Sequence, residues 1–164
     1  MEMEGGLMSV LMEALERRGV GFKEMPHAKT FTSLEEAEAL GIPADSVLKS
    51  VVLDTEFGHA LAVIPGSRRL DMHLVERAVG DREAHLATEE ELRRDFPEIQ
   101  LGAFPPLGST LGVPTFVDPE VFGHDTVVCA TGDQAESVSA RSTELFRDEP
   151  VVVTPLVRDG EYGA

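Results

Sequence analysis

The hydrophobic and polar positions of this chain follow two periods, one typical of helices and one typical of strands. The first segment, residues 7–18, repeats apolar side chains every three to four positions, and Gly19 follows it as a helix-ending residue. A second helix is predicted to begin at a capping box, Ser33-x-x-Glu36, and to end at Gly41. Further helices are expected over residues 71–78, 88–95 and 142–146.

Alternating or continuously apolar runs predict the strands. The run 47–54 is followed by Gly58 and by a second run, 60–64, so these two segments are expected to form a hairpin. Further short strands are expected over residues 20–25, 114–117, 126–131, 137–140 and 151–153. Because helices and strands interleave, we expect an α+β (mixed-sheet α/β) fold, with a mixed central sheet flanked by helices. The chain has no internal repeat or long linker, so residues 1–164 are expected to form a single domain.

Charge and composition narrow the classes of function. The formal net charge is −16, with 30 acidic residues against 14 lysines and arginines. Such a surface repels polyanions, which argues against DNA as a partner and against broad nucleic-acid binding. Three arginine pairs, at 17–18, 68–69 and 93–94, either form a local basic patch or are solvated surface charges.

From the cysteine and histidine content we expect no metal or other cofactor. One cysteine cannot form an intramolecular disulfide or a thiolate cluster, and the five histidines lack the close spacing of a metal-binding helix. The start of the chain is acidic and does not resemble a signal peptide. No apolar run has the length of a membrane span, so we expect a cytoplasmic protein without a membrane partner.

Lys49 is the most unusual residue of the predicted sheet. It stands in the apolar run 47–54 and is one of only three lysines. A cation among valine and leucine side chains has to be paired or used in a site, because burying an unpaired charge is unfavourable. Lys49 shares a strand face with Val47 and Val51, so it either points into a pocket with an apolar floor or reaches from a sheet edge into water.

A loop rich in glycine and proline, residues 102–108, follows about fifty residues after Lys49. Glycines permit close backbone approach and prolines rigidify the loop, so its remaining N–H groups could stabilise an oxyanion or hold a ribose hydroxyl. The alternative is an ordinary connection between elements. Serine-nucleophile, phosphate-loop and dinucleotide motifs are missing from the sequence, which disfavours nucleotide hydrolysis and hydride transfer.

Several segments together resemble a known family. The run Thr30-Phe31-Thr32-Ser33-x-Glu35-Glu36-Ala37-x-Ala39-Leu40-Gly41-Ile42-Pro43, the strand Val47-Leu48-Lys49-Ser50-Val51-Val52 and the Gly102-x-x-x-Pro106 motif are similar to the YbaK/ProX-type aminoacyl-tRNA deacylase family. The same segments resemble the editing domain inserted in bacterial prolyl-tRNA synthetases. Residues 114–118 and 130–133 lie where that family carries its later core strands, so the resemblance covers about residues 8–155.

The resemblance implies a cytoplasmic trans-editing hydrolase. Such an enzyme cleaves the ester of a mischarged aminoacyl-tRNA at its 3′ end, often on tRNA for proline, without a metal, a cofactor or a covalent nucleophile. An aminoacyl-tRNA synthetase is a further partner that the family suggests. Lys49 matches the essential strand lysine that anchors the terminal nucleotide, and Gly102 and Pro106 match the loop that holds the aminoacyl end. The substrate-binding residues expected beside them are His27, Phe31, Ala103, Phe104, Gly132 and Asp133.

Other interpretations stay open on the sequence alone. A binding or regulatory module with the same fold, without catalysis, would be compatible with the acidic surface. An unrelated hydrolase of small esters or nucleotides is a third alternative. Asp133 has two interpretations of its own, because it either orients a substrate amine or caps the turn after the strand 126–131.

Overall fold

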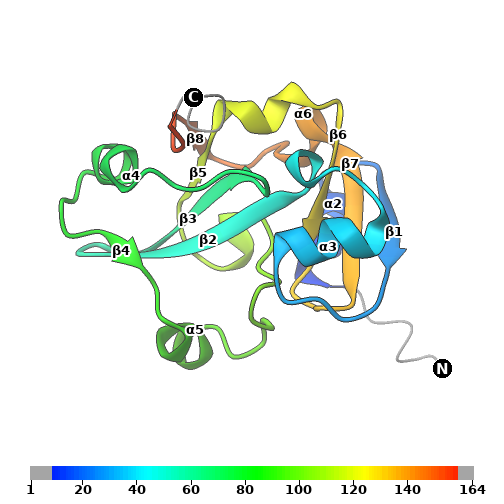
Figure 1. Ribbon diagram of the computed structural model, residues 1–164, viewed down its shortest axis with the longest axis horizontal. Helices are drawn as coiled ribbons and strands as arrows, with labels where there is room; N and C mark the ends of the chain where they lie inside the picture. Colours follow the sequence, from blue (N-terminus) through cyan, green and yellow to red (C-terminus); the bar gives the residue numbers. More distant parts are fainter. Residues whose placement is uncertain (1–8, 159–164) are drawn as a thin grey trace.

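The computed structural model describes residues 9–158 and arranges them as two β-sheets with α-helices packed around them (Figure 1). The α-helices of this region are α2 (Val10–Arg17), α3 (Ser33–Leu40), α4 (Met72–Val79), α5 (Glu89–Asp95) and α6 (Ser142–Leu145). The strands are β1 (Phe22–Pro26), β2 (Leu48–Thr55), β3 (Gly58–Pro65), β4 (His85–Leu86), β5 (Thr115–Val117), β6 (Thr126–Ala130), β7 (Glu136–Arg141) and β8 (Val151–Val153). Short 3₁₀ turns occur at η1 (Ala44–Ser46), η2 (Gly108–Thr110) and η3 (Pro119–Gly123).

The larger sheet is mixed and the smaller one is antiparallel. Five strands form the larger sheet in the order β4-β2-β3-β5-β8, where β2 and β3 are the antiparallel hairpin and β3, β5 and β8 run parallel. The smaller sheet has the order β1-β7-β6. A parallel bridge between Val47 and Val128 joins the two sheets at the residue that directly precedes β2, the strand that carries Lys49. The start of β2 is therefore held against both sheets.

The main hydrophobic core lies between the two sheets and α2. Strand β3 shows the alternation that builds it, because Leu61 and Val63 face this core while Ala62 and Ile64 face a second core under α4. In Figure 1 the smaller sheet and α3 lie at the right, and the larger sheet extends to the left between α4 and α5. Cys129 on β6 is 1% exposed and belongs to the main core.

Most predicted elements are confirmed, including the hairpin and the helix that Asp71 caps. The predicted capping box Ser33-x-x-Glu36 is wrong by one position. Thr32 is the N-cap of α3 and accepts a hydrogen bond from the N–H of Glu35, whose carboxylate in turn accepts from the N–H of Phe31. Because Thr32 and Glu35 make the cap, Ser33 and Glu36 take no part in it, and both side chains lie on the buried face of the helix. Residues 7 and 8 of the first predicted helix lie outside the described residues.

Candidate active site

A cavity of about 260 Å³ lies where α3, β2, β6 and the loop 102–108 meet. Its wall is formed by Phe31, Thr32, Ser33, Glu36, Leu48, Lys49, Ser50, Gly102, Phe104 and Ala130. This volume is below the ~300–1,000 Å³ of pockets that take drug-sized ligands. The cavity therefore suits a group as small as an amino acid, with a larger substrate remaining outside.

Lys49 reaches this cavity from the start of β2 and is half-buried there. Its Nζ donates one hydrogen bond, to the backbone oxygen of Arg68 at 3.1 Å. Within residues 9–158 no acidic side chain forms an ion pair with Lys49. Burial, followed by the nearby charge of Arg69, lowers the pKa of the Lys49 ammonium from its usual value. The structure thus leaves a desolvated ammonium with free N–H donors beside a cavity, which is what a site for substrate oxygens requires.

Gly102 brings the glycine- and proline-rich loop to the opposite wall of the cavity. It has a φ of +80°, and a Cβ at this position would lie 2.0 Å from the backbone oxygen of Phe31. Only glycine therefore allows the loop to pack this closely against Phe31. The N–H of Gly102 makes no hydrogen bond within the described residues, so it remains a candidate donor to a substrate oxygen.

The other loop residues of the sequence prediction have different positions. Phe104 lines the cavity and is buried. Ala103 and Pro106 are buried but are not among the residues that form the cavity wall, and the N–H of Ala103 is already bonded to the oxygen of Gln100 at 3.0 Å. These two residues can hold the loop in place without touching the contents of the cavity.

Gly132 and Asp133 lie outside this cavity. They border a wider depression on the other side of the loop, together with Ile99, Pro105 and Glu136. The Asp133 carboxylate accepts a hydrogen bond from the N–H of Ala135 at 2.8 Å, as expected for a residue that caps a turn. The structure therefore brings Phe31, Lys49, Gly102 and Phe104 together and separates Gly132 and Asp133 from them.

The cavity contains a carboxyl group that the sequence analysis assigned to helix capping. Glu36 is 4% exposed and accepts a short hydrogen bond from the Ser137 hydroxyl, which also contacts His27 Nε2 at 2.8 Å. Burial raises the pKa of Glu36, and the hydrogen bond from Ser137 and the charge of His27 oppose that shift. The helical spacing of Ser33, Glu36 and Ala37 could have revealed this position, because all three share the buried face of α3.

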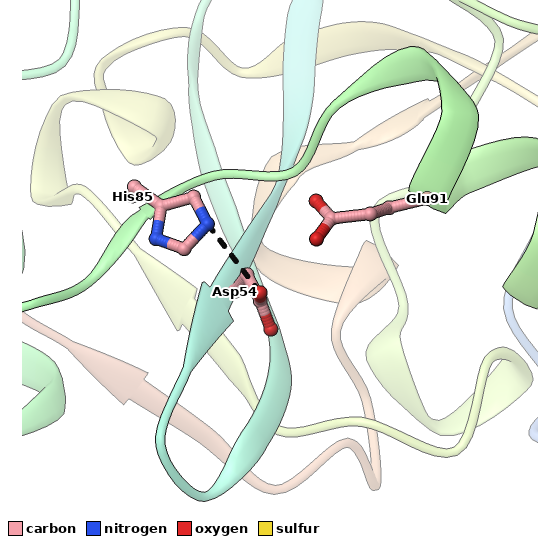
Figure 2. A group of neighbouring side chains, drawn as sticks. All are labelled: Asp54, His85 and Glu91. Carbon is pink, nitrogen blue, oxygen red and sulfur yellow. Dashed lines mark ion pairs between the residues drawn. The ribbon is translucent and has the colours of Figure 1, made fainter.

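A second cluster of titratable groups lies at the other end of β2. Figure 2 shows Asp54, His85 and Glu91 from β2, β4 and the first turn of α5, and their ligand atoms all lie within 4.8 Å of one another. His85 Nε2 is 3.4 Å from Asp54, and Glu91 accepts the N–H of Thr88 in a capping box. These contacts already account for the three side chains, so the cluster is explained as an ion pair beside a helix cap.

Comparisons with known proteins relate this chain to aminoacyl-tRNA editing proteins. Residues 27–147 match the family model of the aminoacyl-tRNA editing domain. A candidate Cys-tRNA(Pro)/Cys-tRNA(Cys) deacylase, EbsC of Enterococcus faecalis, is 25% identical over 131 residues, which cover 77% of this chain and 79% of that protein. The proline–tRNA ligase of Thermotoga sp. strain RQ2 is 29% identical over 87 residues, covering 53% of this chain and 15% of the ligase.

Solved structures extend the likeness to the whole fold. The crystal structure of a candidate trans-editing enzyme for prolyl-tRNA synthetase superposes with a TM-score of 0.76 at 30% identity, covering 93% of this chain and 99% of that one. The chain spans only about a seventh of the ligases it matches, as the RQ2 ligase illustrates. No helix within residues 9–158 has the length and apolar character needed to cross a membrane. The family match spans most of the sequence and includes the cavity, so the chain belongs to the aminoacyl-tRNA editing domain family.

Proposed function

We propose that this chain is a free-standing trans-editing deacylase that hydrolyses the ester between a wrong amino acid and the 3′-terminal ribose of a tRNA, with tRNA for proline as the preferred tRNA. The family match, the candidate Cys-tRNA(Pro) deacylase and the candidate trans-editing enzyme support this proposal. The observation that carries it is the ammonium of Lys49, which lines a cavity of amino-acid size and has no acidic partner within residues 9–158.

The residues of the cavity suit the chemistry of ester hydrolysis. An ester is an activated acyl group, so a positioned water and stabilisation of the developing oxyanion provide most of what the reaction needs. Lys49 would hold oxygens of the terminal nucleotide, and the N–H of Gly102 would donate to the ester oxygen. Phe31 is 56% exposed at the rim of the cavity, where its ring is available to stack with the terminal adenine.

Single-turnover deacylation of a panel of charged tRNAs tests this proposal. The panel contains alanyl-, cysteinyl- and prolyl-tRNA for proline, together with a small free amino-acid ester. We expect hydrolysis of at least one mischarged tRNA and at least a tenfold slower reaction of the correctly charged tRNA. A cavity wall that excludes one methylene is worth roughly 1–3 kcal/mol, which corresponds to a discrimination of this size.

The alternative is a binding module that has the fold but no turnover. The net charge of −16 is the observation that favours it, because such a surface repels tRNA. This alternative predicts binding of a ligand or protein and no hydrolysis across the whole panel. Equal rates on the free ester and on charged tRNA would instead indicate a general esterase.

Arg69 is the residue from which we expect local compensation for the acidic surface. It is exposed next to Lys49, and within residues 9–158 it makes no ion pair, whereas Arg18, Arg68 and Arg94 pair with Glu149, Glu120 and Asp95. An exposed cation whose charge acts on Lys49 is placed to contact a phosphate of the tRNA end.

Replacing Arg69 with alanine is expected to weaken tRNA binding about tenfold and to reduce the salt dependence of binding by roughly one phosphate contact. Filter binding at several salt concentrations measures both quantities. The matched control is Arg93→Ala, because Arg93 is exposed on α5 and pairs with Glu89 at 3.4 Å. An equal loss of affinity in the two variants would show that Arg69 acts only through the net charge.

A further inference from the structure

The side chains of His27, Ser137 and Glu36 form a continuous chain from the surface to the cavity. His27 is half-buried after β1, Ser137 is fully buried on β7, and Glu36 lines the cavity from α3. His27 Nε2 is 2.8 Å from the Ser137 oxygen, and Ser137 donates to the Glu36 Oε2. Three separate elements therefore meet through one serine hydroxyl.

The donors and acceptors of this chain restrict where its protons lie. His27 Nδ1 is 2.7 Å from the backbone oxygen of Ala28, which can only accept, so Nδ1 carries a proton. The Ser137 hydroxyl has one proton, so it can donate a hydrogen bond to only one of its two neighbours, His27 and Glu36. Either His27 Nε2 donates to Ser137 while Ser137 donates to an ionised Glu36, or a protonated Glu36 donates to Ser137 while Ser137 donates to a neutral His27.

These two arrangements contain the same number of protons and the same hydrogen bonds with reversed direction. Two short proton shifts across the Ser137 hydroxyl convert one into the other. The chain therefore connects the ionisation of a carboxyl group in the cavity with an imidazole that solvent can reach.

The carboxyl end of the chain is available to the contents of the cavity. Only Oε2 of Glu36 takes a hydrogen bond from the described residues, and Oε1 has no such partner. The charged or titratable groups around the chain are Lys49 from β2, Cys129 from β6, and Glu136 near His27; Glu136 in turn interacts with Glu24 and Asp133. Within residues 9–158 neither Lys49 nor any other cation pairs with the Glu36 carboxylate.

The geometry points to Glu36 as the proton-transfer group of ester hydrolysis in this cavity, with Ser137 and His27 as positioning residues that exchange its proton with solvent. This inference rests on the proposed function. A carboxyl whose pKa is raised by burial is closer to the operating pH than an ordinary one, which makes it a more effective base.

In the proposed hydrolysis, the Glu36 carboxylate takes one proton from water as the water oxygen bonds to the ester carbonyl carbon. The bond from that carbon to the ribose oxygen then breaks, and Glu36 returns the proton to the ribose oxygen. The products are the free amino acid, which releases its carboxyl proton to solvent, and the ribose hydroxyl. Glu36 therefore ends the cycle as the carboxylate it began as, and Ser137 and His27 influence the reaction through the fraction of molecules in which Glu36 is ionised at the start.

The test is the pH dependence of single-turnover deacylation for the wild type, Glu36→Gln, Ser137→Ala and Ser137→Thr, after subtraction of the uncatalysed rate. In the wild type the rate is expected to rise with pH as Glu36 ionises. Glu36→Gln keeps the shape and the acceptor for Ser137, and we expect about a 10²-fold loss of rate and no such rise.

Ser137→Ala is expected to move the rise to higher pH and Ser137→Thr to restore it. The direction follows because the hydrogen bond from Ser137 lowers the pKa of Glu36, so losing that bond raises the pKa. Circular dichroism and thermal melting establish that each variant is folded. The ¹⁵N shifts of the His27 ring test the chain without turnover: Nδ1 is expected to be protonated, and the Nε2 shift is expected to change in Glu36→Gln.

An unchanged pH profile in Glu36→Gln would overturn this inference while leaving the deacylase function intact. A loss of affinity alone, with a normal maximal rate and normal pH profile, would assign Glu36 to binding of the substrate's α-ammonium and would also overturn it. Absence of hydrolysis by the wild-type protein would instead overturn the proposed function itself. If the ¹⁵N shift of His27 Nε2 is the same in the wild type, Glu36→Gln and Ser137→Ala, then Ser137 does not couple His27 to Glu36, and the inference is overturned.

Discussion

Replacing Lys49 with alanine is expected to lower the single-turnover deacylation rate by about 10²-fold or more, because a substrate whose terminal nucleotide is no longer held in place loses its alignment for reaction. The ammonium lies in the cavity and donates to the oxygen of Arg68, and its remaining protons have no partner within residues 9–158. Its loss therefore removes the proposed contacts to substrate and, within residues 9–158, one hydrogen bond of the protein.

The fold of the Lys49→Ala variant is expected to be as stable as the wild type, or slightly more stable. Burial lowers the pKa of Lys49 in the folded state, so the folded protein binds this proton less tightly than the unfolded chain does. Below the folded-state pKa the charged lysine therefore opposes folding, and this opposition declines as the pH rises through the folded-state pKa and is gone above the pKa of the unfolded chain. Urea denaturation at pH 7 measures the effect.

Two control variants separate the charge of Lys49 from its shape. Lys49→Met keeps the aliphatic stem and is expected to be as inactive as Lys49→Ala. Lys23→Ala removes an exposed lysine of β1 and is expected to retain full activity. Retention of more than a tenth of the wild-type rate in Lys49→Met would contradict the assigned role of the ammonium.

Replacing Gly102 with alanine is expected to reduce the free energy of unfolding by about 3 kcal/mol, because the change combines backbone strain with a collision. The φ of +80° disfavours any residue with a Cβ, and that Cβ would lie 2.0 Å from the Phe31 oxygen and 2.7 Å from its carbonyl carbon. Both contacts are with backbone, so relief requires the loop or Phe31 to move.

Movement of either segment changes the cavity, and we expect the deacylation rate to fall together with stability. Gly112→Ala is the matched control, since Gly112 has a φ of +75° and nothing within 4 Å of the added Cβ. The free energy of unfolding of Gly112→Ala is expected to fall by about 1 kcal/mol through backbone strain alone, and the variant is expected to retain activity. Equal losses of stability in the two alanine variants would mean that contact with Phe31 does not restrict Gly102.

The sequence was sufficient to predict the family and most of the elements, the short strand β4 excepted, but not the arrangement of the site. Lys49 and Gly102 could be identified because a cation in an apolar strand and a glycine in a rigid loop are visible without a structure. Glu36 was assigned to a capping box because its spacing from Ser33 imitates that motif, whereas Thr32 makes the cap. A local motif contains no information about which face of a helix a distant strand will cover.

The positions of Asp133 and Ser137 depend on contacts between remote segments. Asp133 follows a strand, and only the folded loop shows that its carboxylate is used in a turn instead of the cavity. Ser137 is one of two serines in β7, and its importance follows from the pairing of β7 with β1, which places it beside His27. Such pairings connect residues more than a hundred positions apart, beyond the reach of sequence periodicity.

The burial of Cys129 gives this protein an intrinsic probe of local unfolding. The thiol is 1% exposed, and burial, reinforced by the charge of Glu36, raises its pKa well above the usual range. Disulfide reagents attack through the thiolate, so labelling should occur only in molecules in which β6 has separated from its neighbours. Because Cys129 directly precedes Ala130 of the cavity wall, a substrate analogue that occupies the cavity should slow labelling, which measures binding without turnover, radioactivity or an engineered label.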